Sequence, residues 1–158
     1  MPRKKTKSLQ REPNPDRLYS SVLVQRLIHK SMKDGKKSSA EKAVYMAMEF
    51  AAEKAKSKNP LEVLEAAFDN VLPAFEVKGH RVGGSNLQVP YPVQGHRRTH
   101  LAMMWFVSSA RSKKGMPYWK RLGTEIVDAY NESGSAVKKK EEVHKMAEAN
   151  RAFAHFAR

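Results

Sequence analysis

Several basic side chains stand beside glycine or at predicted helix starts, where they could bind phosphate groups. Lys33 and Lys36–Lys37 flank Gly35 in a short loop that precedes a predicted helix. Free backbone N–H groups at a helix start and ammonium groups both attract anions. Arg97–Arg98 open a later predicted helix in the same way, and arginine can hold a phosphate or a base edge through two parallel hydrogen bonds. These clusters predict contacts with a polyanion.

Metal binding and catalysis have weaker support in the sequence. His96 and His100 stand four residues apart, so both lie on one helix face and could supply two metal ligands. No third ligand lies nearby in the sequence, and the alternative is a pair that faces phosphate or is merely exposed. The chain has no cysteine, no Walker-type phosphate loop, no nucleophile elbow and no HExxH zinc helix. We therefore expect no catalytic residue, no cofactor and no bound metal.

A predicted hairpin, from about residue 74 to 93, carries another cationic group. Apolar and polar residues alternate on both sides of a segment that contains Gly79 and Gly83–Gly84. Pro90 and Pro92 cannot donate ladder hydrogen bonds, which favours a two-stranded arm over a wide sheet. About six residues per strand would reach roughly 20 Å from the body. Lys78, His80 and Arg81 accompany the glycines, and we expect this tip to touch a partner.

Helices must position the remaining clusters. Apolar residues at helical spacing predict helices at about 22–32, 38–51, 60–72, 95–109 and 117–130, and from about 135. The expected caps are Ser20 or Ser21, a Ser38 and Glu41 capping box, and Asn59 before a proline. The helix from 95 has the broadest apolar sector and should be central. Leu101, Met104, Trp105 and Ser108 lie on one of its faces, and Ala102, Phe106 and Ser109 lie on the adjoining face. Carboxylates on the second, third and fifth helices are expected to be solvated.

Charge is unevenly distributed over the 158 residues. Lys and Arg number 30 against 16 Asp and Glu, which gives a formal charge of +14. Residues 1–40 and 76–121 each carry a net +8, whereas 41–75 carry −2 and 122–158 carry 0. Two basic surfaces are therefore expected, with nucleic acid as the first partner to consider. No apolar run is long enough for a membrane span, and no apolar stretch of a secretion signal follows the basic start, so we expect an intracellular protein.

The predicted fold class is mainly α: a six-helix domain with one projecting two-stranded β-hairpin arm and an extended basic N-terminal tail. Residues 1–17 are basic, contain three prolines and offer no apolar face, so they form the tail. Residues 18–158 form a single helical RNA-binding domain with extended residues at its end. Two other function classes are a DNA-binding regulator with a helix-turn-helix and a nucleic-acid enzyme. The second predicted helix lacks a row of residues suited to base edges, and no catalytic constellation is present.

Three strings of residues stand out in the sequence. They are Met32-Lys33-Asp34-Gly35-Lys36-Lys37, Arg81-Val82-Gly83-Gly84-Ser85-Asn86 with Gln88-Val89-Pro90, and Ala136-Val137-Lys138-Lys139-Lys140 leading to the segment 146–155. Together they resemble a known family, the small-subunit ribosomal protein S-seven, in its bacterial and organellar form. The resemblance covers residues from about 14 to 156. The sequence departs from the family at Gly79–His80, where a proline and a basic residue are more common. It also ends Phe156-Ala157-Arg158, where the family often has Tyr, Arg and Trp.

The resemblance implies a structural constituent of the small ribosomal subunit. It implies binding to the three-prime major domain of small-subunit ribosomal RNA, nucleation of head assembly, and a place near messenger RNA and exit-site tRNA. The implied protein partners are ribosomal protein S-eleven and other head proteins, with no membrane and no small-molecule substrate. The implied location is the ribosome of a bacterial cytoplasm, or of an organelle matrix or stroma.

The candidate residues fall into two sets. Those expected to bind ribosomal RNA are Arg3, Lys4, Lys5, Lys7, Arg11, Lys33, Lys36, Lys37, Lys78, Arg97, Arg98, Arg111, Lys113, Lys114, Lys138, Lys139, Lys140 and Arg151. Those expected near messenger RNA and exit-site tRNA are His80, Arg81, Val82, Gly83, Gly84 and Ser85.

Overall fold

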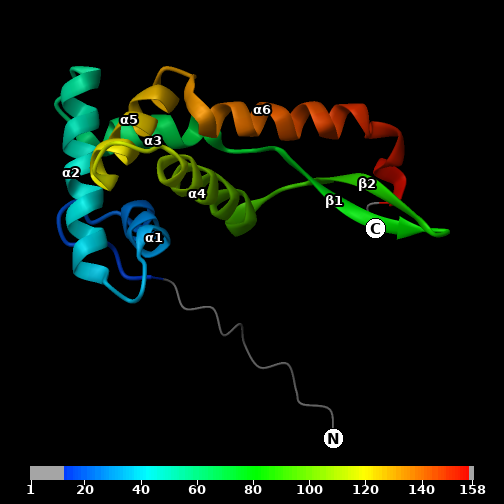
Figure 1. Cartoon of the computed structure of the whole chain (residues 1–158), viewed down its shortest axis with the longest axis horizontal. Helices are drawn as coiled ribbons and strands as arrows, with labels where there is room; N and C mark the ends of the chain where they lie inside the picture. Colours follow the sequence, from blue (N-terminus) through cyan, green and yellow to red (C-terminus); the bar gives the residue numbers. More distant parts are fainter. Residues whose placement is uncertain (1–12, 157–158) are drawn as a thin grey trace, which may run out of the picture.

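Six α-helices, one two-stranded sheet and a short 3₁₀ helix make up the computed structural model, which describes residues 13–156 (Figure 1). The elements are α1 (Val22–Ser31), α2 (Lys37–Ala55), α3 (Pro60–Val71), β1 (Phe75–Val82), β2 (Ser85–Pro92), α4 (Gly95–Ser112), α5 (Tyr118–Tyr130), α6 (Gly134–Ala149) and the 3₁₀ helix η1 (Arg151–Phe156). Helices α1 to α5 gather at one end of the molecule, and α6 runs out from them alongside the hairpin. The predicted mainly α fold with one β-arm is confirmed. Within 13–156, no helix combines the length and the apolar composition needed to cross a membrane.

The core lies where α5 packs against α2, α3 and α4. Leu122 and Ile126 of α5 are fully buried, and Gly123 lets the two backbones approach closely. A Cβ atom at Gly123 would lie 2.9 Å from the carbonyl oxygen of Ala47 in α2. The expected central position of α4 is confirmed, because Trp105 is only 6% exposed.

The faces of α4 differ in part from the prediction. Met104 is 37% exposed and Ser108 is also exposed, so neither shares the buried face of Trp105. Leu101 and Trp105 are buried as predicted, and so is the adjoining face with Ala102, Phe106 and Ser109.

The helix starts follow the sequence signals unevenly. At α3 the prediction is confirmed, because the Asn59 side chain accepts a hydrogen bond from the Leu61 N–H at 3.1 Å. At α2 the predicted capping box is wrong, because the helix already begins at Lys37 and Ser38 lies inside its first turn. Positive φ angles at Asp34 and Gly35, 52° and 72°, reverse the chain so sharply that the helix resumes at once.

The segment before α1 is anchored to the body at Asp16. This carboxylate is 4% exposed and accepts hydrogen bonds from the backbone N–H groups of Leu18, Tyr19 and Ser21 at 2.8 to 3.0 Å. The hydroxyl of Tyr45 in α2 also donates to it at 3.2 Å. All three backbone donors precede α1, so Asp16 holds the segment before the helix and does not cap the helix itself. The expected side-chain cap is wrong, because the N-cap residue Ser21 forms no side-chain cap hydrogen bond. The boundary drawn after residue 17 falls inside this anchored segment.

The arm is an antiparallel hairpin whose register runs from Phe75 opposite Pro92 to Val82 opposite Ser85. Gly83 and Gly84 form its two-residue turn with φ angles of 56° and 89°, a combination that favours glycine. Gly79 pairs with Gln88 inside the strands and is not part of the tip, contrary to the prediction. Each strand has eight residues rather than about six.

The arm rests on the C-terminal part of the chain along much of its length. The Ala74 N–H donates to Nε2 of His144 in α6 at 3.0 Å, and the rings of Phe75 and His144 meet edge to face at 6.3 Å. Residues 151–156 form η1, which packs on β2, instead of the extended end that we expected. Phe153 and Phe156 are spaced three residues apart, which matches the three residues per turn of a 3₁₀ helix.

Candidate nucleic-acid interface

An open cleft of about 480 Å³ lies between the α1–α2 loop, the end of α4 and the first turn of α5. Its cationic lining consists of Lys33, Lys36, Arg111 and Arg121, and Asp34 is its one carboxylate. Within residues 13–156, none of these four cations forms an ion pair with a carboxylate. The cleft therefore has a strongly positive lining that ion pairs within residues 13–156 do not neutralise.

Hydrogen bonds between distant segments hold the walls of this cleft. Arg111 donates to the carbonyl oxygen of Ser31 at 3.3 Å, and the hydroxyl of Tyr118 donates to that of Ser31 at 2.9 Å. Arg121 donates through Nη1 to the carbonyl oxygens of Arg111 and Lys113. Both arginines thus have neutral acceptors, which fix their positions and leave their charge in place.

A second basic group lies where the arm meets α4. Both Nε and Nη2 of Arg97 donate to one oxygen of Glu76, at 2.9 and 2.7 Å, and Lys78 contacts the other oxygen at 2.6 Å. Burial alone would raise the pKa of Glu76, but Arg97 and Lys78 outweigh it and hold that pKa below its ordinary value. Arg97 and Lys78 each remain 53% exposed, so one carboxylate orients two cations that stay open to solvent.

Further basic residues lie where α1 packs on α4, namely Lys30 of α1 and His100 of α4. Partial burial lowers the pKa of His100, and the charges of Lys30 and Arg97 lower it further. Lys30 directly precedes Ser31, which lines the cleft. We call the cleft, Lys30 with His100, and the arm base around Glu76 together the basic strip.

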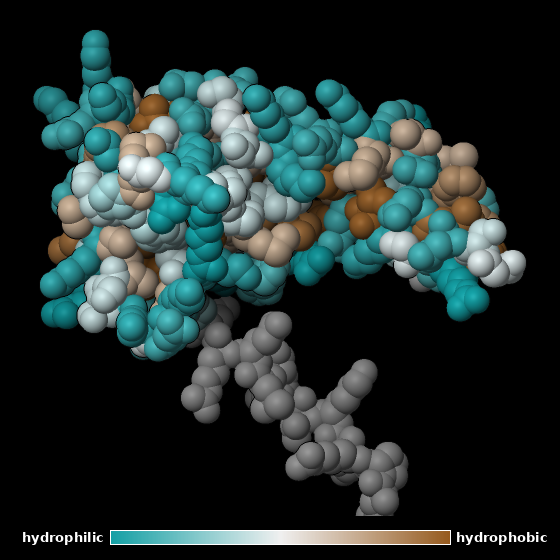
Figure 2. Space-filling model, in the orientation of Figure 1, coloured by the Kyte–Doolittle hydropathy of each residue, from teal (hydrophilic) through white to brown (hydrophobic). Residues whose placement is uncertain are grey.

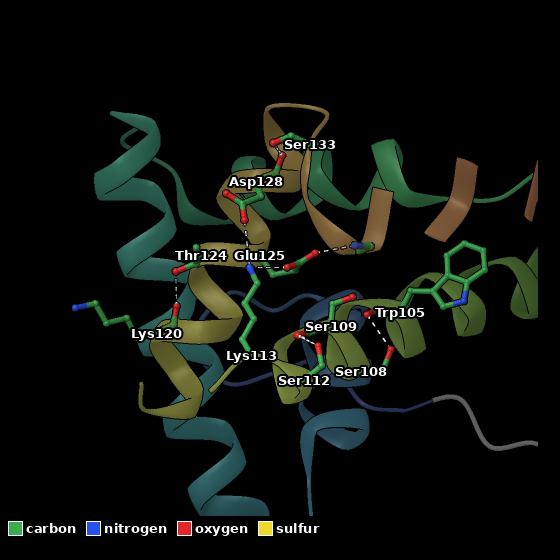
Figure 3. A network of polar contacts seen from close by, with 11 residues as sticks. Trp105, Ser108, Ser109, Ser112, Lys113, Lys120, Thr124, Glu125, Asp128 and Ser133 are labelled. Carbon is green, nitrogen blue, oxygen red and sulfur yellow. Dashed lines mark hydrogen bonds and ion pairs between the residues drawn. The ribbon is translucent and has the colours of Figure 1, made fainter. Parts of the chain in front are cut away.

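Three of the predicted RNA-binding residues use their charged groups to bond to other residues of the protein. Nζ of Lys113 lies 2.7 Å from Glu125 and 3.2 Å from Asp128 (Figure 3). Burial would lower the pKa of Lys113, but these two carboxylates raise it. Lys140 donates to the carbonyl oxygen of Asn70 near the end of α3, and Arg98 donates to that of Pro73 at 3.0 Å. We therefore no longer expect Lys113 in the interface, because two carboxylates pair with it. Lys140 and Arg98 bond to neutral carbonyl oxygens, as Arg111 and Arg121 do, and keep their charge.

Glu125 corrects the prediction that the carboxylates of the fifth helix are solvated. Its side chain is fully buried, and it accepts a hydrogen bond from the N–H of Ala136 at 2.7 Å. The Lys113–Glu125–Asp128 cluster thus joins the end of α4 to α5 and to the start of α6 (Figure 3).

Most of the other predicted residues that the structure describes are exposed, and none of them lines the cleft. Lys138, Lys139 and Arg151 are exposed in α6 and η1, and Lys139 pairs with Glu142 at 2.9 Å. Lys114 lies exposed in the α4–α5 loop, and Lys37 is exposed in the first turn of α2. At the tip of the arm, His80, Arg81, Gly83, Gly84 and Ser85 are exposed, and Val82 is half-buried. Arg3, Lys4, Lys5, Lys7 and Arg11 lie outside the described residues.

A metal site needs several ligating side chains close together. Among residues 13–156, no group of three or more His, Cys, Asp or Glu is placed to hold a metal ion.

Hydrophilic side chains cover most of the face seen in Figure 2, and apolar residues gather on the half formed by the arm and α6.

Sequence reasoning missed the residues that complete the cleft. Arg121, Tyr118 and Ser39 line it, yet they belong to helices predicted from their apolar faces alone. The basic pair Lys120–Arg121 directly after an aromatic pair was the available signal. Its position opposite the Lys33 loop depends on helix packing, which local spacing does not reveal.

Known proteins are similar to this chain over nearly its whole length. Residues 2–151 match the family described as Ribosomal protein S7p/S5e. A protein of Thermosipho africanus named small ribosomal subunit protein uS7 is 57% identical over 146 residues, which cover 92% of this chain and 94% of that protein. The proteins of that name from Dictyoglomus turgidum and Roseiflexus castenholzii are 56% and 51% identical. The first match covers 92% of this chain and 93% of the relative, and the second covers 100% and 99%. Coverage and identity of this extent show that the chain belongs to the Ribosomal protein S7p/S5e family.

Proposed function

We propose that this chain is a structural component of the small ribosomal subunit that binds ribosomal RNA through its basic strip. The strip comprises the cleft, Lys30 with His100, and the arm base around Glu76. The observation that carries the proposal is the gathering of Lys33, Lys36, Arg111 and Arg121 around one cleft without a paired carboxylate in the described residues. The printed name of the relatives, small ribosomal subunit protein, supports the same assignment.

The chemistry of the strip favours recognition of RNA shape and backbone over base sequence. Ammonium and guanidinium groups that replace condensed counterions supply most of the binding free energy in such interfaces. Double-stranded RNA presents phosphates and 2′-hydroxyl groups more openly than base edges. Strip residues held by Glu76 and by backbone carbonyl oxygens would present their charges in one fixed arrangement.

A DNA-binding helix-turn-helix finds no support in this arrangement. Such a motif requires the second helix to offer an exposed face to the major groove. In α2, the face with Ala40, Val44, Ala47 and Ala51 is buried, and the helix packs along α5. Its exposed positions include Lys42, Met46 and Glu49, which form no row of residues suited to base edges.

The finer proposal is that the protein binds the three-prime major domain of small-subunit ribosomal RNA and nucleates assembly of the head. Chemical footprinting of the full chain on naked small-subunit RNA tests it directly. We expect protected nucleotides confined to the three-prime major domain, and fewer protections after charge removal at Lys33 and Lys36. Protection in another domain, or none at all, would overturn the assignment.

We also propose that the arm tip approaches messenger RNA and exit-site tRNA, and that the protein contacts ribosomal protein S-eleven and other head proteins. The exposed His80 and Arg81 beside the glycine turn support this role, since glycines allow a nucleic-acid strand to approach the backbone closely. The proposed location is the ribosome of the bacterial cytoplasm, with an organelle matrix or stroma as the alternative.

The register of the hairpin gives a clean way to test the role of the tip. Lys78 and Val89 are cross-strand partners. They are a hydrogen-bonded pair like Val82 and Ser85, which flank the native two-residue turn, because such pairs alternate along an antiparallel ladder. Residues 79–88 can therefore be replaced by an Asn-Gly turn without shifting the remaining pairs. Subunits reconstituted with the shortened arm should assemble normally but release exit-site tRNA faster than wild type. Failed assembly with normal tRNA release would reverse the roles assigned to tip and body.

A further inference from the structure

We propose that the cleft between the α1–α2 loop and the start of α5 is a preformed site for one phosphate group of the RNA backbone. The inference rests on the proposed RNA-binding function and assigns a ligand class to one part of its surface. The cleft, of about 480 Å³, leaves room for the sugars on either side of that phosphate.

The first support is the charge of the lining. Four cationic side chains, Lys33, Lys36, Arg111 and Arg121, face the single carboxylate of Asp34, which leaves a formal charge of +3. Within the described residues, none of the four forms an ion pair with a carboxylate. Like charges brought together without neutralisation repel each other, so an anion between them would remove an unfavourable interaction.

The second support is the balance of donors and acceptors. The start of α2 borders the cleft, and no side chain in residues 13–156 caps it. The N–H groups of Lys37 and Ala40 donate to the carbonyl oxygens of Gly35 and Lys36, which leaves those of Ser38 and Ser39 as the first-turn donors without an intrahelical acceptor. The hydroxyl of Ser39 also lines the cleft. Donors therefore exceed acceptors, which suits the oxygens of a phosphodiester better than a base edge, because a base edge also presents donors.

The third support is that the cleft is already built without RNA. Ser31 is buried and ties α1 to both Arg111 and Tyr118. Arg121 fixes the end of α4 to α5 through the carbonyl oxygen of Lys113. A site with walls held in this way requires little ordering when the ligand binds, and so it should accept a small oxyanion that has no RNA attached.

Nuclear magnetic resonance of the full chain tests the site with inorganic phosphate as the probe. Sodium phosphate, sodium chloride at equal ionic strength and the nucleoside uridine are titrated in parallel. We expect saturable shifts of the backbone amides of Ser38, Ser39 and Ala40 with phosphate only. Equal shifts with chloride would show a general effect of ionic strength without a specific phosphate site. Saturable shifts with uridine would show that the cleft binds a base or sugar. Either result overturns the proposal.

Two double variants with the same change in charge supply the control. Lys33→Gln with Lys36→Gln removes two lining cations, whereas Lys42→Gln with Lys58→Gln removes two exposed lysines outside the lining. The first pair should weaken phosphate binding on the order of tenfold, and the second should change it less than about twofold. Equal weakening by both pairs would contradict a localised site.

Salt titrations with a ribosomal RNA fragment separate this inference from the proposed function. Removing one phosphate contact should make the slope of log affinity against log salt shallower by about one, and only the Lys33 and Lys36 pair should do so. If wild type binds the fragment with a steep slope and this pair keeps that slope, the phosphate site is refuted and the RNA-binding function stands. If wild type does not bind the fragment, the function fails and this inference fails with it, whatever the phosphate titration shows.

Discussion

Replacing Lys113 by methionine should destabilise the fold and leave RNA binding by the folded protein nearly unchanged. The change keeps most of the aliphatic stem and removes the ammonium group that lies 2.7 Å from the fully buried Glu125. Breaking a buried ion pair by removing one partner costs about 3 to 5 kcal/mol. A quarter of the Lys113 side chain is exposed, and Glu125 keeps the Ala136 N–H as a donor. We therefore take the lower end, about 3 kcal/mol, or a loss of roughly 6 to 12 °C in melting temperature for a domain of this size.

Urea unfolding and RNA binding, measured on the same proteins, check this result. Lys114→Met is the matched control, because Lys114 is exposed and forms no ion pair within residues 13–156; it should shift stability by less than about 0.5 kcal/mol. In the double variant Lys113→Met with Glu125→Gln, the loss should be smaller than the sum of the single losses by at least about 0.5 kcal/mol, because the two side chains interact. If Lys113→Met left stability intact and weakened RNA binding, Lys113 would be an RNA ligand after all and the reasoning from its ion pairs would be refuted.

Three further results follow from the structure. Asp16→Ala should lower the free energy of unfolding in urea by about 1 to 3 kcal/mol, because several N–H donors lose a buried acceptor, and an unchanged variant would contradict the anchoring role of Asp16. Burial would raise the pKa of Asp16, but the hydrogen bonds from Tyr19, Ser21 and Leu18 lower it. The stability that Asp16 contributes is therefore present above about pH 3.8 and is lost as the pH falls. Trp105→Ala should cost about 3 to 5 kcal/mol without changing the RNA affinity of the folded protein, and weaker RNA binding at full stability would show that the core and the binding face had been confused. Burial and then the charge of Lys140 lower the pKa of His144, and its unprotonated Nε2 accepts a hydrogen bond from the Ala74 N–H. The stability that His144 contributes is therefore complete above about pH 6.5 and is lost as the pH falls through the lowered pKa. In His144→Gln the free energy of unfolding should depend less on pH in that range, and identical curves would refute the contact between His144 and Ala74.

Membership of a family of structural ribosomal proteins confirms the resemblance recognised in the sequence and the expectation that the chain is not an enzyme. The helix order and the hairpin were predictable because their signals are local. Asn59 before Pro60 starts α3, Pro117 precedes α5, and Gly83–Gly84 makes the hairpin turn. Each signal acts within a few residues, so no knowledge of packing is needed to interpret it.

Features that depend on packing were not predictable. In sequence, Glu125 resembles any other carboxylate on a helix. Its burial is compensated only in the folded protein, by the ion pair with Lys113 and the hydrogen bond from the Ala136 N–H. The anchoring of Asp16 depends partly on Tyr45, which lies 29 residues away. Helix η1 has no strong helical pattern of its own and packs on β2.

The candidate site was predictable in its parts and not in its assembly. Lys33, Lys36 and Arg111 are basic residues in separate segments, and charge alone identified them. Arg111 reaches Ser31 across 80 residues of sequence, and this contact brings the segments to one cleft. Local spacing could not distinguish such residues from Lys113, whose ammonium group pairs with internal carboxylates.

The most direct test of the RNA-binding account is the affinity of the full chain for the three-prime major domain of small-subunit ribosomal RNA, measured across salt concentrations. If the basic strip neutralises roughly half a dozen phosphates, the affinity should fall about a thousandfold between 50 and 200 mM salt. An affinity that does not change with salt, or equal binding to an unrelated RNA domain at every salt concentration, would contradict it.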